Sequence, residues 1–497
     1  MLFNSYSFIL VFMPVVLTGF LLLARRSMAI AMLWLAVASV FFYGYWSLAA
    51  LPILLLSIGF NYLAGRILLA SSNENVRRRV MWAAVVVDLV ALGFFKYTNF
   101  LVATFHGLFG GQPPAAYQIA LPIGISFFTF TQIAFIVDCY KGLAKETKFA
   151  HYVLFVSYFP HLVAGPILHH KQMMPQFSSM TAYRLDAKTA VTALCMFAIG
   201  LAKKTLLADP LGSVADAMFN AVDLGAQPTF GSSWMGVLAY TFQIYFDFSG
   251  YSDMAIGISL LFGIALPINF NSPYKALSMI DFWRRWHISL SNFLRDYLYI
   301  PLGGNRRGEF WRYLNVIVTM LLGGLWHGAS WTFVIWGGMH GCFLAVNHFW
   351  RRWRKAGLPN KHLGWLLTFV CVVFAWVSFR ATSVESALRI YRAMLKPHLS
   401  DFHLLAGWWH ALPSLNWHDW FDSVMPAALL ALAFFIVLRL PGSSEFAAAD
   451  RRVFLLSGNP VAQPVVLGAA RILALGGLFG ASLAMLSGVS KFLYFQF

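Results

Sequence analysis

His327 stands in a sequence setting that suits proton transfer inside a membrane. It ends an apolar run that begins near Tyr313, directly after a stretch rich in arginine. A helix from Tyr313 to His327 rises by about 22 Å, whereas the hydrocarbon core of a bilayer is about 30 Å thick, so we expect His327 within the membrane. Gly323, Gly324 and Gly328 predict close backbone approach around it. A neutral imidazole there can act as a general base, or it can be a structural histidine bonded to a carbonyl between helices.

His287 closes the segment Asp-Phe-Trp-Arg-Arg-Trp-His, which begins at Asp281. Ser278 together with Asp281 predicts a capping box that opens a helix. Three aromatic residues and two arginines in this segment are typical of an amphipathic helix at the membrane interface. His287 is then either incidental to that helix or a second polar group in the same site as His327.

Two carboxylates, Asp247 and Asp253, lie in an otherwise apolar segment. Buried carboxylates need partners, and the sequence offers the arginines of the following cationic stretch, Arg284, Arg285 and Arg295. We expect structural ion pairs here in preference to a catalytic role.

Further polar residues lie between these carboxylates and His287. Asn269, Asn271 and Tyr274 can bind polar groups of a substrate, or they can cap helices. The guanidinium groups of Arg284 and Arg285 are candidates for attracting an anionic substrate.

The composition indicates which elements must position these residues. The chain has 497 residues, of which 59% are hydrophobic and 11% charged, and its formal net charge is +17. Apolar runs near the ~20 residues that cross a bilayer recur along the whole chain. The cationic residues cluster between these runs, so the positive-inside rule explains the charge better than nucleic-acid binding does. We therefore predict an all-α polytopic membrane protein, with residues 1–497 as one domain.

Charges at the ends of the apolar runs predict the topology. The N-terminus and the C-terminus are expected outside, and the cationic stretch at 264–312 is expected in the cytoplasm. Residues 152–168 are apolar but contain Pro160, Gly165 and Pro166, which predicts a re-entrant segment covered by protein. Residues 383–423, which are rich in tryptophan, are expected to form an outer cap. We expect no metal site.

Several segments of the chain resemble the membrane-bound O-acyltransferase (MBOAT) family. The resemblance covers nearly the whole chain, and the branch it most resembles is that of bacterial alginate O-acetylation. The segments that carry it are LPIGISFFTF (121–130), PHLVAGP (160–166), DFSGYSD (247–253), NFNSPY (269–274), DFWRRWH (281–287), RDYLYIPLGG (295–304) and LWHG (325–328).

The resemblance implies a ring of tilted transmembrane helices with re-entrant segments around a central funnel. It implies His327 as the main catalytic residue and His287 as its partner. It also implies a thioester donor, acetyl-CoA or an acyl-carrier protein, on the cytoplasmic side of a bacterial inner membrane. No cofactor is expected to stay bound. An extracytoplasmic partner with a serine-hydrolase-like fold would complete O-acetylation of a polysaccharide.

The C-terminal sequence ends in Lys-Phe-Leu-Tyr-Phe-Gln-Phe, with Tyr494 as the only hydroxyl in its last six residues. So apolar an end is expected to fold back onto the protein or a partner. Tyr494 is either part of an aromatic anchor at the interface or a transient acyl carrier. The resemblance raises the second interpretation, because similar endings occur among acyl-exporting proteins.

Other functions remain open from the sequence. Within the enzyme class the alternative is transfer of D-alanine or another acyl group to a cell-wall polymer. Outside it, the chain would be a transporter with incidental histidines or a scaffold that docks the true transferase. The absence of a visible internal repeat argues against the transporter.

Overall fold

The structure is a computed structural model, and it describes residues 1–110, 116–144, 148–163, 165–180, 182–354, 360–397, 417–443, 445, 468–486 and 492–493. The described secondary structure is helical. The α-helices are α1 (Met13–Ala24), α2 (Met28–Trp46), α3 (Leu51–Ala70), α4 (Glu74–Phe109), α5 (Ile125–Tyr140), α6 (Phe149–Ser157), α7 (Phe159–Leu162), α8 (His170–Ser179), α9 (Ala187–Ala202), α10 (Asp209–Asp223), α11 (Phe230–Leu261), α12 (Met279–Trp283), α13 (Ile288–Leu294), α14 (Glu309–His327), α15 (Trp331–Arg354), α16 (Lys361–Arg380), α17 (Val384–Leu395), α19 (Trp417–Arg439) and α22 (Ala469–Ala484).

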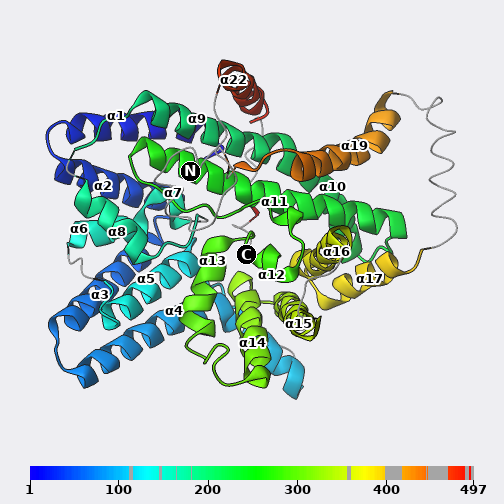
Figure 1. Ribbon diagram of the computed structural model, residues 1–497, viewed down its shortest axis with the longest axis horizontal. Coiled ribbons are helices and arrows are strands. Elements are labelled where there is room, and N and C mark those ends of the chain that lie inside the picture. The colour runs from blue at the N-terminus through cyan, green and yellow to red at the C-terminus, as the bar shows by residue number, and fades with distance from the viewer. Residues whose placement is uncertain are drawn as a thin grey trace.

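Longer helices surround a centre formed by short ones. Figure 1 shows α12 and α13 near the middle, with α11 on one side and α4, α14 and α15 on the other. Within the described ranges, six helical stretches are long and apolar enough to cross a membrane. They are Ser7–Ala24, Met28–Trp46, Leu51–Ala70, Glu74–Phe109, Ala187–Asp223 and Lys361–Arg380. The all-α polytopic membrane fold is therefore confirmed.

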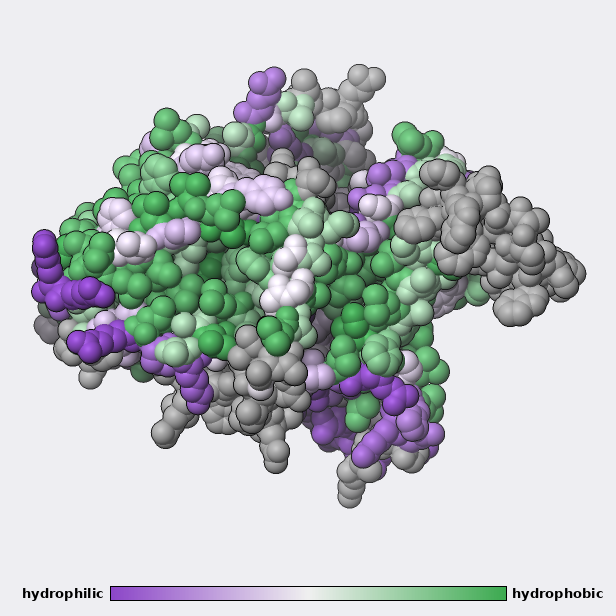
Figure 2. All heavy atoms as spheres, turned by 90° about the horizontal axis from the view of Figure 1, so that it is seen from above, coloured by the Kyte–Doolittle hydropathy of each residue, from purple (hydrophilic) through white to green (hydrophobic). Residues whose placement is uncertain are grey.

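The outer surface suits a lipid environment. Figure 2 shows one face as a broad apolar surface, with hydrophilic residues gathered toward its edges. Large apolar side chains are exposed on the outer helices, among them Leu56 of α3 at 74% and Leu108 of α4 at 74%. In water such a surface would be an aggregation hazard, whereas lipid chains solvate it.

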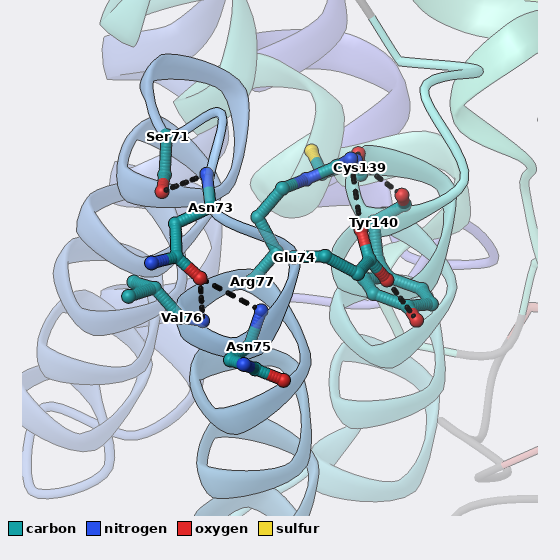
Figure 3. A network of polar contacts seen from close by, with 8 residues as sticks. All are labelled: Ser71, Asn73, Glu74, Asn75, Val76, Arg77, Cys139 and Tyr140. Carbon is teal, nitrogen blue, oxygen red and sulfur yellow. Dashed lines mark hydrogen bonds and ion pairs between the residues drawn. The ribbon is translucent and has the colours of Figure 1, made fainter.

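Polar contacts join the start of α4 to the end of α5, as Figure 3 shows. The side chain of Asn73 accepts from the backbone N–H groups of the first turn of α4, so it acts as the N-cap. The guanidinium of Arg77 donates to the last carbonyls of α5, those of Cys139 and Tyr140. The Tyr140 hydroxyl donates to Glu74 over 2.6 Å. The cationic ends of these two helices thus lie together, as the charge pattern predicts.

Helices α14 and α15 form a hairpin. Glu309 at the start of α14 pairs with Arg352 at the end of α15, and Arg312 lies 2.6 Å from the His348 ring. Both cationic ends of the hairpin are therefore on one side, and His327 lies at the opposite end of α14. A Cβ at Gly324 would lie 2.2 Å from the carbonyl oxygen of Phe333, so glycine there permits the close contact.

Helices α9 and α11 make a second close contact through glycine. A Cβ at Gly250 would lie 2.7 Å from the carbonyl oxygen of Gly200, and a Cβ at Gly200 would lie 2.5 Å from that of Gly250. Small residues let transmembrane helices approach closely. This contact fixes α9 and its continuation against α11, the helix that carries Asp247 and Asp253.

In the described parts of the chain, three π-helical segments interrupt or extend the helices: η1 (Ser7–Phe12), η2 (Lys203–Ala208) and η4 (Arg295–Tyr299). Each ends two residues before a proline, namely Pro14, Pro210 or Pro301. Proline has no N–H and crowds the carbonyl four residues earlier, which explains the wider turn. The segment η2 joins α9 to α10 and contains two buried or nearly buried lysines.

The predicted re-entrant segment is broken into α6 and α7. Residues 154–163 are all buried, and Pro160 lies in the first turn of α7. Protein therefore covers this irregular backbone, as the membrane requires. Within the tryptophan-rich stretch 383–423, which was expected to form an outer cap, residues 398–416 lie outside the described residues.

Candidate active site

His327 lies at the C-terminal end of α14, where only 4% of its surface is exposed. Aromatic rings surround its imidazole. The ring centroids of Trp326, Trp336 and Phe379 lie 4.9, 5.1 and 5.1 Å from that of His327, and all three rings are steeply inclined to it. An imidazole in such surroundings is poorly solvated, which favours its neutral form.

Helix α4 holds the backbone on which His327 stands. Lys96 Nζ donates to the carbonyl oxygens of Trp326 and His327 over 2.5 and 3.1 Å, and the Tyr97 hydroxyl donates to that of Leu325 over 2.6 Å. The last carbonyls of a helix lack partners within it, and a cation there is favourable. Sequence reasoning missed Lys96, whose only signal is a single lysine within an apolar span.

His287 does not lie on a helix, contrary to the prediction. Helix α12 ends at Trp283, and His287 adopts a left-handed conformation (φ 42°, ψ 56°) just before α13. Its side chain is fully buried within the protein. One half of the capping box forms, because the Ser278 side chain accepts from the N–H of Asp281, but the Asp281 carboxylate accepts from the N–H of Leu277 and the helix has only five residues.

Asn269 sets the protonation of the His287 ring. Its Oδ1 lies 3.3 Å from His287 Nδ1 and also accepts from the backbone N–H and hydroxyl of Ser289 over 3.1 and 2.9 Å. Since that oxygen only accepts, Nδ1 carries the proton in this bond. The other nitrogen, Nε2, is then the basic one.

Trp326 brings the two histidines into one cluster. Its ring centroid lies 6.1 Å from that of His287 and 4.9 Å from that of His327. Residues far apart in the sequence, from the loop before α13 and the end of α14, therefore meet around one indole. The arrangement supplies two buried imidazoles in contact with one indole, which is a setting for general acid–base chemistry.

The partners of the buried carboxylates are lysines, and the expected arginine partners are wrong. Lys203 Nζ lies 2.6 Å from Asp253, and Lys204 Nζ lies 2.6 Å from Asp247 and 2.9 Å from Asp209. Both lysines come from η2, which the glycine contact between α9 and α11 places beside the aspartates. The expectation that these carboxylates form structural ion pairs agrees with this geometry.

The arginines near His287 pair locally instead. Arg285 bonds to Asp281 over 2.8 Å and Arg295 to Asp296 over 2.7 Å. The side chain of Arg284 is exposed. Arg284 thus remains available to an anionic ligand from outside the protein, as a substrate-attracting role requires, whereas Arg285 is already paired with Asp281.

Two of the candidate substrate-binding residues have mainly structural contacts. The Tyr274 hydroxyl donates to the carbonyl of Thr241 over 2.6 Å and accepts from the indole of Trp376 over 3.2 Å. The backbone N–H of Asn271 donates to the carbonyl of Arg285 over 2.9 Å, and its side chain is half-buried. Of the three candidates, Asn269 is the one in direct contact with a histidine of the cluster.

The end of the chain reaches the ion-pair region. Tyr494 lies outside the described residues, but its neighbours Phe492 and Leu493 are buried. The N–H of Leu493 donates to Asp247 over 2.9 Å, and the Phe492 ring lies 4.8 Å from Lys204 Nζ. The expectation that the tail folds back onto the protein holds for these two residues.

A third buried histidine, His340 of α15, was missed by sequence reasoning. It is 0% exposed, and its ring centroid lies 4.7 Å from that of Trp336, which in turn contacts His327. Trp283 donates its indole N–H to His340 Nδ1 over 3.2 Å. In the part of the chain that the structure describes, no three His, Cys, Asp or Glu side chains gather as a metal site.

The fold and the site define a polytopic α-helical membrane protein with a buried pair of histidines at its centre. Residues 115–388 match the membrane-bound O-acyltransferase family. The chain is 43% identical over 426 residues to the peptidoglycan O-acetyltransferase of Helicobacter pylori, which covers 80% of each chain. It is 40% identical over 514 residues to the probable alginate O-acetylase of Azotobacter vinelandii, which covers 100% of each.

The chain therefore belongs to the membrane-bound O-acyltransferase family and is an O-acyltransferase. A more distant relative carries a different acyl group in its name. The teichoic acid D-alanyltransferase of Streptococcus thermophilus is 30% identical over 280 residues, which cover 52% of this chain and 68% of that protein.

Proposed function

We propose that the protein moves an acetyl group from a cytoplasmic thioester across the bacterial inner membrane for O-acetylation of an extracytoplasmic, alginate-like polysaccharide. The observation that carries this proposal is the cluster of His327, Trp326 and His287, two buried imidazoles around one indole. The names of the two relatives that match most of the chain support acetyl as the group and a polysaccharide as its destination.

His327 acts as the general base and acid in the proposed reaction. An acceptor hydroxyl gives its proton to His327 while its oxygen bonds to the carbonyl carbon of the thioester. The carbonyl electron pair moves onto the acyl oxygen and then returns as the carbon–sulfur bond breaks. The proton passes from His327 to the leaving sulfur, so the products are an ester and a thiol.

His287 assists rather than leads. Its Nδ1–H donates to Asn269, so its Nε2 carries the lone pair. A hydrogen bond from a hydroxyl or a thiol to this nitrogen orients that group near His327. The left-handed backbone at His287 also argues for a specific role, because such strain is often kept at functional sites.

The donor arrives on the cationic side. Arg284 is exposed and Arg285 is half-buried, and both lie a few residues before His287. Their charges attract an anionic donor, either acetyl-CoA or an acidic acyl-carrier protein. No bound cofactor is needed for a thioester.

The acceptor lies on the other side of the membrane. We propose Tyr494 as a transient carrier, because the chain beside it is held in the core at Asp247. A phenol has a pKa near 10, so an acetyl-tyrosine is an activated ester. An extracytoplasmic partner with a serine-hydrolase-like fold would take the acetyl group from it and pass it to the polysaccharide.

A transfer assay in proteoliposomes tests this function. The protein is reconstituted into liposomes, and acetyl-CoA or acetyl-carrier protein with a labelled acetyl group is added to the outer solution. Two quantities are measured: the release of free thiol and the transfer of label to the protein. Wild type should release thiol and become labelled, while His327→Gln should do neither. Equal thiol release by both proteins would contradict the proposal.

Transfer of D-alanine is the second candidate, and the teichoic acid relative favours it. The same assay separates the two functions if acetyl and D-alanyl thioesters of one carrier protein are compared. We expect the acetyl donor to be used faster, because the acetyltransferase relatives match more of the chain at higher identity.

A further inference from the structure

Two buried hydrogen-bond donors in the aromatic cluster around His327 have no partner among the described residues. They are the indole Nε1 of Trp336 and the imidazole Nε2 of His340. Their side chains are 1% and 0% exposed, so water at the surface does not reach them. Leaving a polar group unpaired in an apolar interior is costly, and such groups call for an explanation.

Trp283 determines which nitrogen of His340 carries a proton. Its indole nitrogen can only donate, and it lies 3.2 Å from His340 Nδ1. Nδ1 must therefore accept, so in the neutral ring the proton is on Nε2. His340 thus presents an N–H donor, just as Trp336 does.

Trp336 contacts the catalytic histidine of the proposed reaction, and His340 packs against Trp336. Trp336 and His340 are one helical turn apart on α15, and their ring centroids are 4.7 Å apart. The Trp336 ring is also 5.1 Å from the His327 ring and almost perpendicular to it. Two further aromatic rings, those of Phe379 and Trp376, pack against the Trp336 ring, with centroid distances of 5.1 and 5.9 Å.

We propose that Trp336 Nε1–H and His340 Nε2–H together bind the acyl oxygen of the substrate at the moment it becomes negatively charged. This inference rests on the proposed acyl transfer. When the acceptor oxygen bonds to the carbonyl carbon, the carbonyl electron pair moves onto the acyl oxygen, and the two N–H groups donate to it. The pair returns as the bond to the leaving group breaks. Fixed donors in an apolar site stabilise such charge strongly.

The test compares two substitutions of His340, each of which imitates the hydrogen-bonding position of one ring nitrogen. Asparagine resembles the Nδ1 side, so His340→Asn can keep the bond from Trp283 but loses the donor at Nε2. Glutamine reaches the Nε2 position, so His340→Gln keeps a donor there but loses the bond from Trp283. A structural role for His340 favours asparagine, whereas oxyanion binding favours glutamine.

We expect kcat for thiol release to fall by roughly 10²- to 10³-fold in His340→Asn, the effect of losing one such donor. His340→Gln should retain at least ten times more activity than His340→Asn, with KM similar in both. Activities are compared at equal amounts of folded protein, judged by its elution in detergent. Equal activity of the two variants, or higher activity of His340→Asn, would overturn the inference.

Trp336→Phe gives an independent test if the His340 variants do not fold. It keeps an aromatic ring against His327 but removes the N–H, so kcat should fall by a similar factor while the protein elutes normally. Full turnover in Trp336→Phe would also overturn the inference. Wild-type turnover distinguishes failure of the proposed acyl transfer from failure of the oxyanion site. A wild type that releases no thiol contradicts the proposed function. An active wild type together with a fully active Trp336→Phe contradicts only the oxyanion site.

Discussion

The backbone N–H of Leu493 lies 2.9 Å from a carboxylate oxygen of Asp247, a residue 246 positions earlier in the chain. The same carboxylate bonds to Lys204, whose ammonium group lies over the ring of Phe492. The end of the chain is thus attached to a charged group that is itself held in the middle of α11. This contact gives the C-terminal residues a defined place in the protein.

Tyr494 is the first target for mutagenesis. Tyr494→Phe keeps the aromatic ring and removes the hydroxyl, so polymer acetylation should be lost if the phenol carries the acetyl group. Mass spectrometry of the wild-type C-terminal peptide should then detect an added acetyl group. Phe492→Leu serves as a control for packing of the tail. Full polymer acetylation in Tyr494→Phe would reduce the tail to an anchor.

The ion pair between Lys204 and Asp247 predicts a stability effect. Lys204→Met leaves the Asp247 charge buried without its main partner, and breaking such a pair typically costs about 3–5 kcal/mol. The double variant Lys204→Met with Asp247→Asn removes both charges and should be more stable than Lys204→Met alone. Thermal unfolding in detergent measures this order. The account of this pair fails if the double variant melts below the single one.

The contact between α9 and α11 predicts that Gly250 tolerates no side chain. Gly250→Ala places a Cβ against the carbonyl of Gly200, and overpacking of this kind costs about 1–3 kcal/mol. Gly231→Ala, on the same helix, is the matched control because a Cβ there has nothing within 4 Å. We expect a lower melting temperature and a lower membrane level for Gly250→Ala only. Equal behaviour of the two variants would mean that the helices are not packed this closely.

Substitution of His287 should lower the rate of thiol release without preventing the protein from folding. His287→Gly removes the imidazole and suits the positive φ, so the protein should insert and melt at least as well as His287→Ala. Both variants should release thiol far more slowly than wild type while they still bind the acyl donor. Donor binding and thiol release are measured on the same samples. Wild-type turnover in His287→Gly would make His287 a structural residue.

The apolar runs and charged clusters of the sequence predicted most of the fold. Long apolar runs predicted the membrane-crossing helices, and the charges at the ends of the runs predicted that cationic ends lie together, as they do where Glu309 and Arg352 meet. Helix length alone placed His327 at the far end of α14. These features depend on local sequence and on the thickness of the bilayer, which do not require knowledge of tertiary packing.

The missed features depend on which helices touch. Lys203 and Lys204 pair with Asp253 and Asp247 only because α9 packs on α11. No pattern in the sequence shows that contact, and the nearer arginines seemed better partners. Lys96 similarly reaches α14 from a distant helix.

The backbone at His287 and the role of His340 were missed for related reasons. A capping box marks where a helix begins but says nothing of where it ends, so the left-handed turn at His287 was not foreseen. His340 is one of two histidines in α15, and its contacts with Trp283 and Trp336 distinguish it.

The central claim is that His327 performs the acyl transfer, and the acetyl content of the polymer tests it most directly. Cells lacking the wild-type gene are complemented with His327→Ala or with the control His362→Ala, whose histidine is exposed at the start of α16. Both proteins should reach normal membrane levels. We predict no detectable polymer acetylation with His327→Ala and full acetylation with His362→Ala. Retained acetylation in the His327→Ala strain would contradict the account.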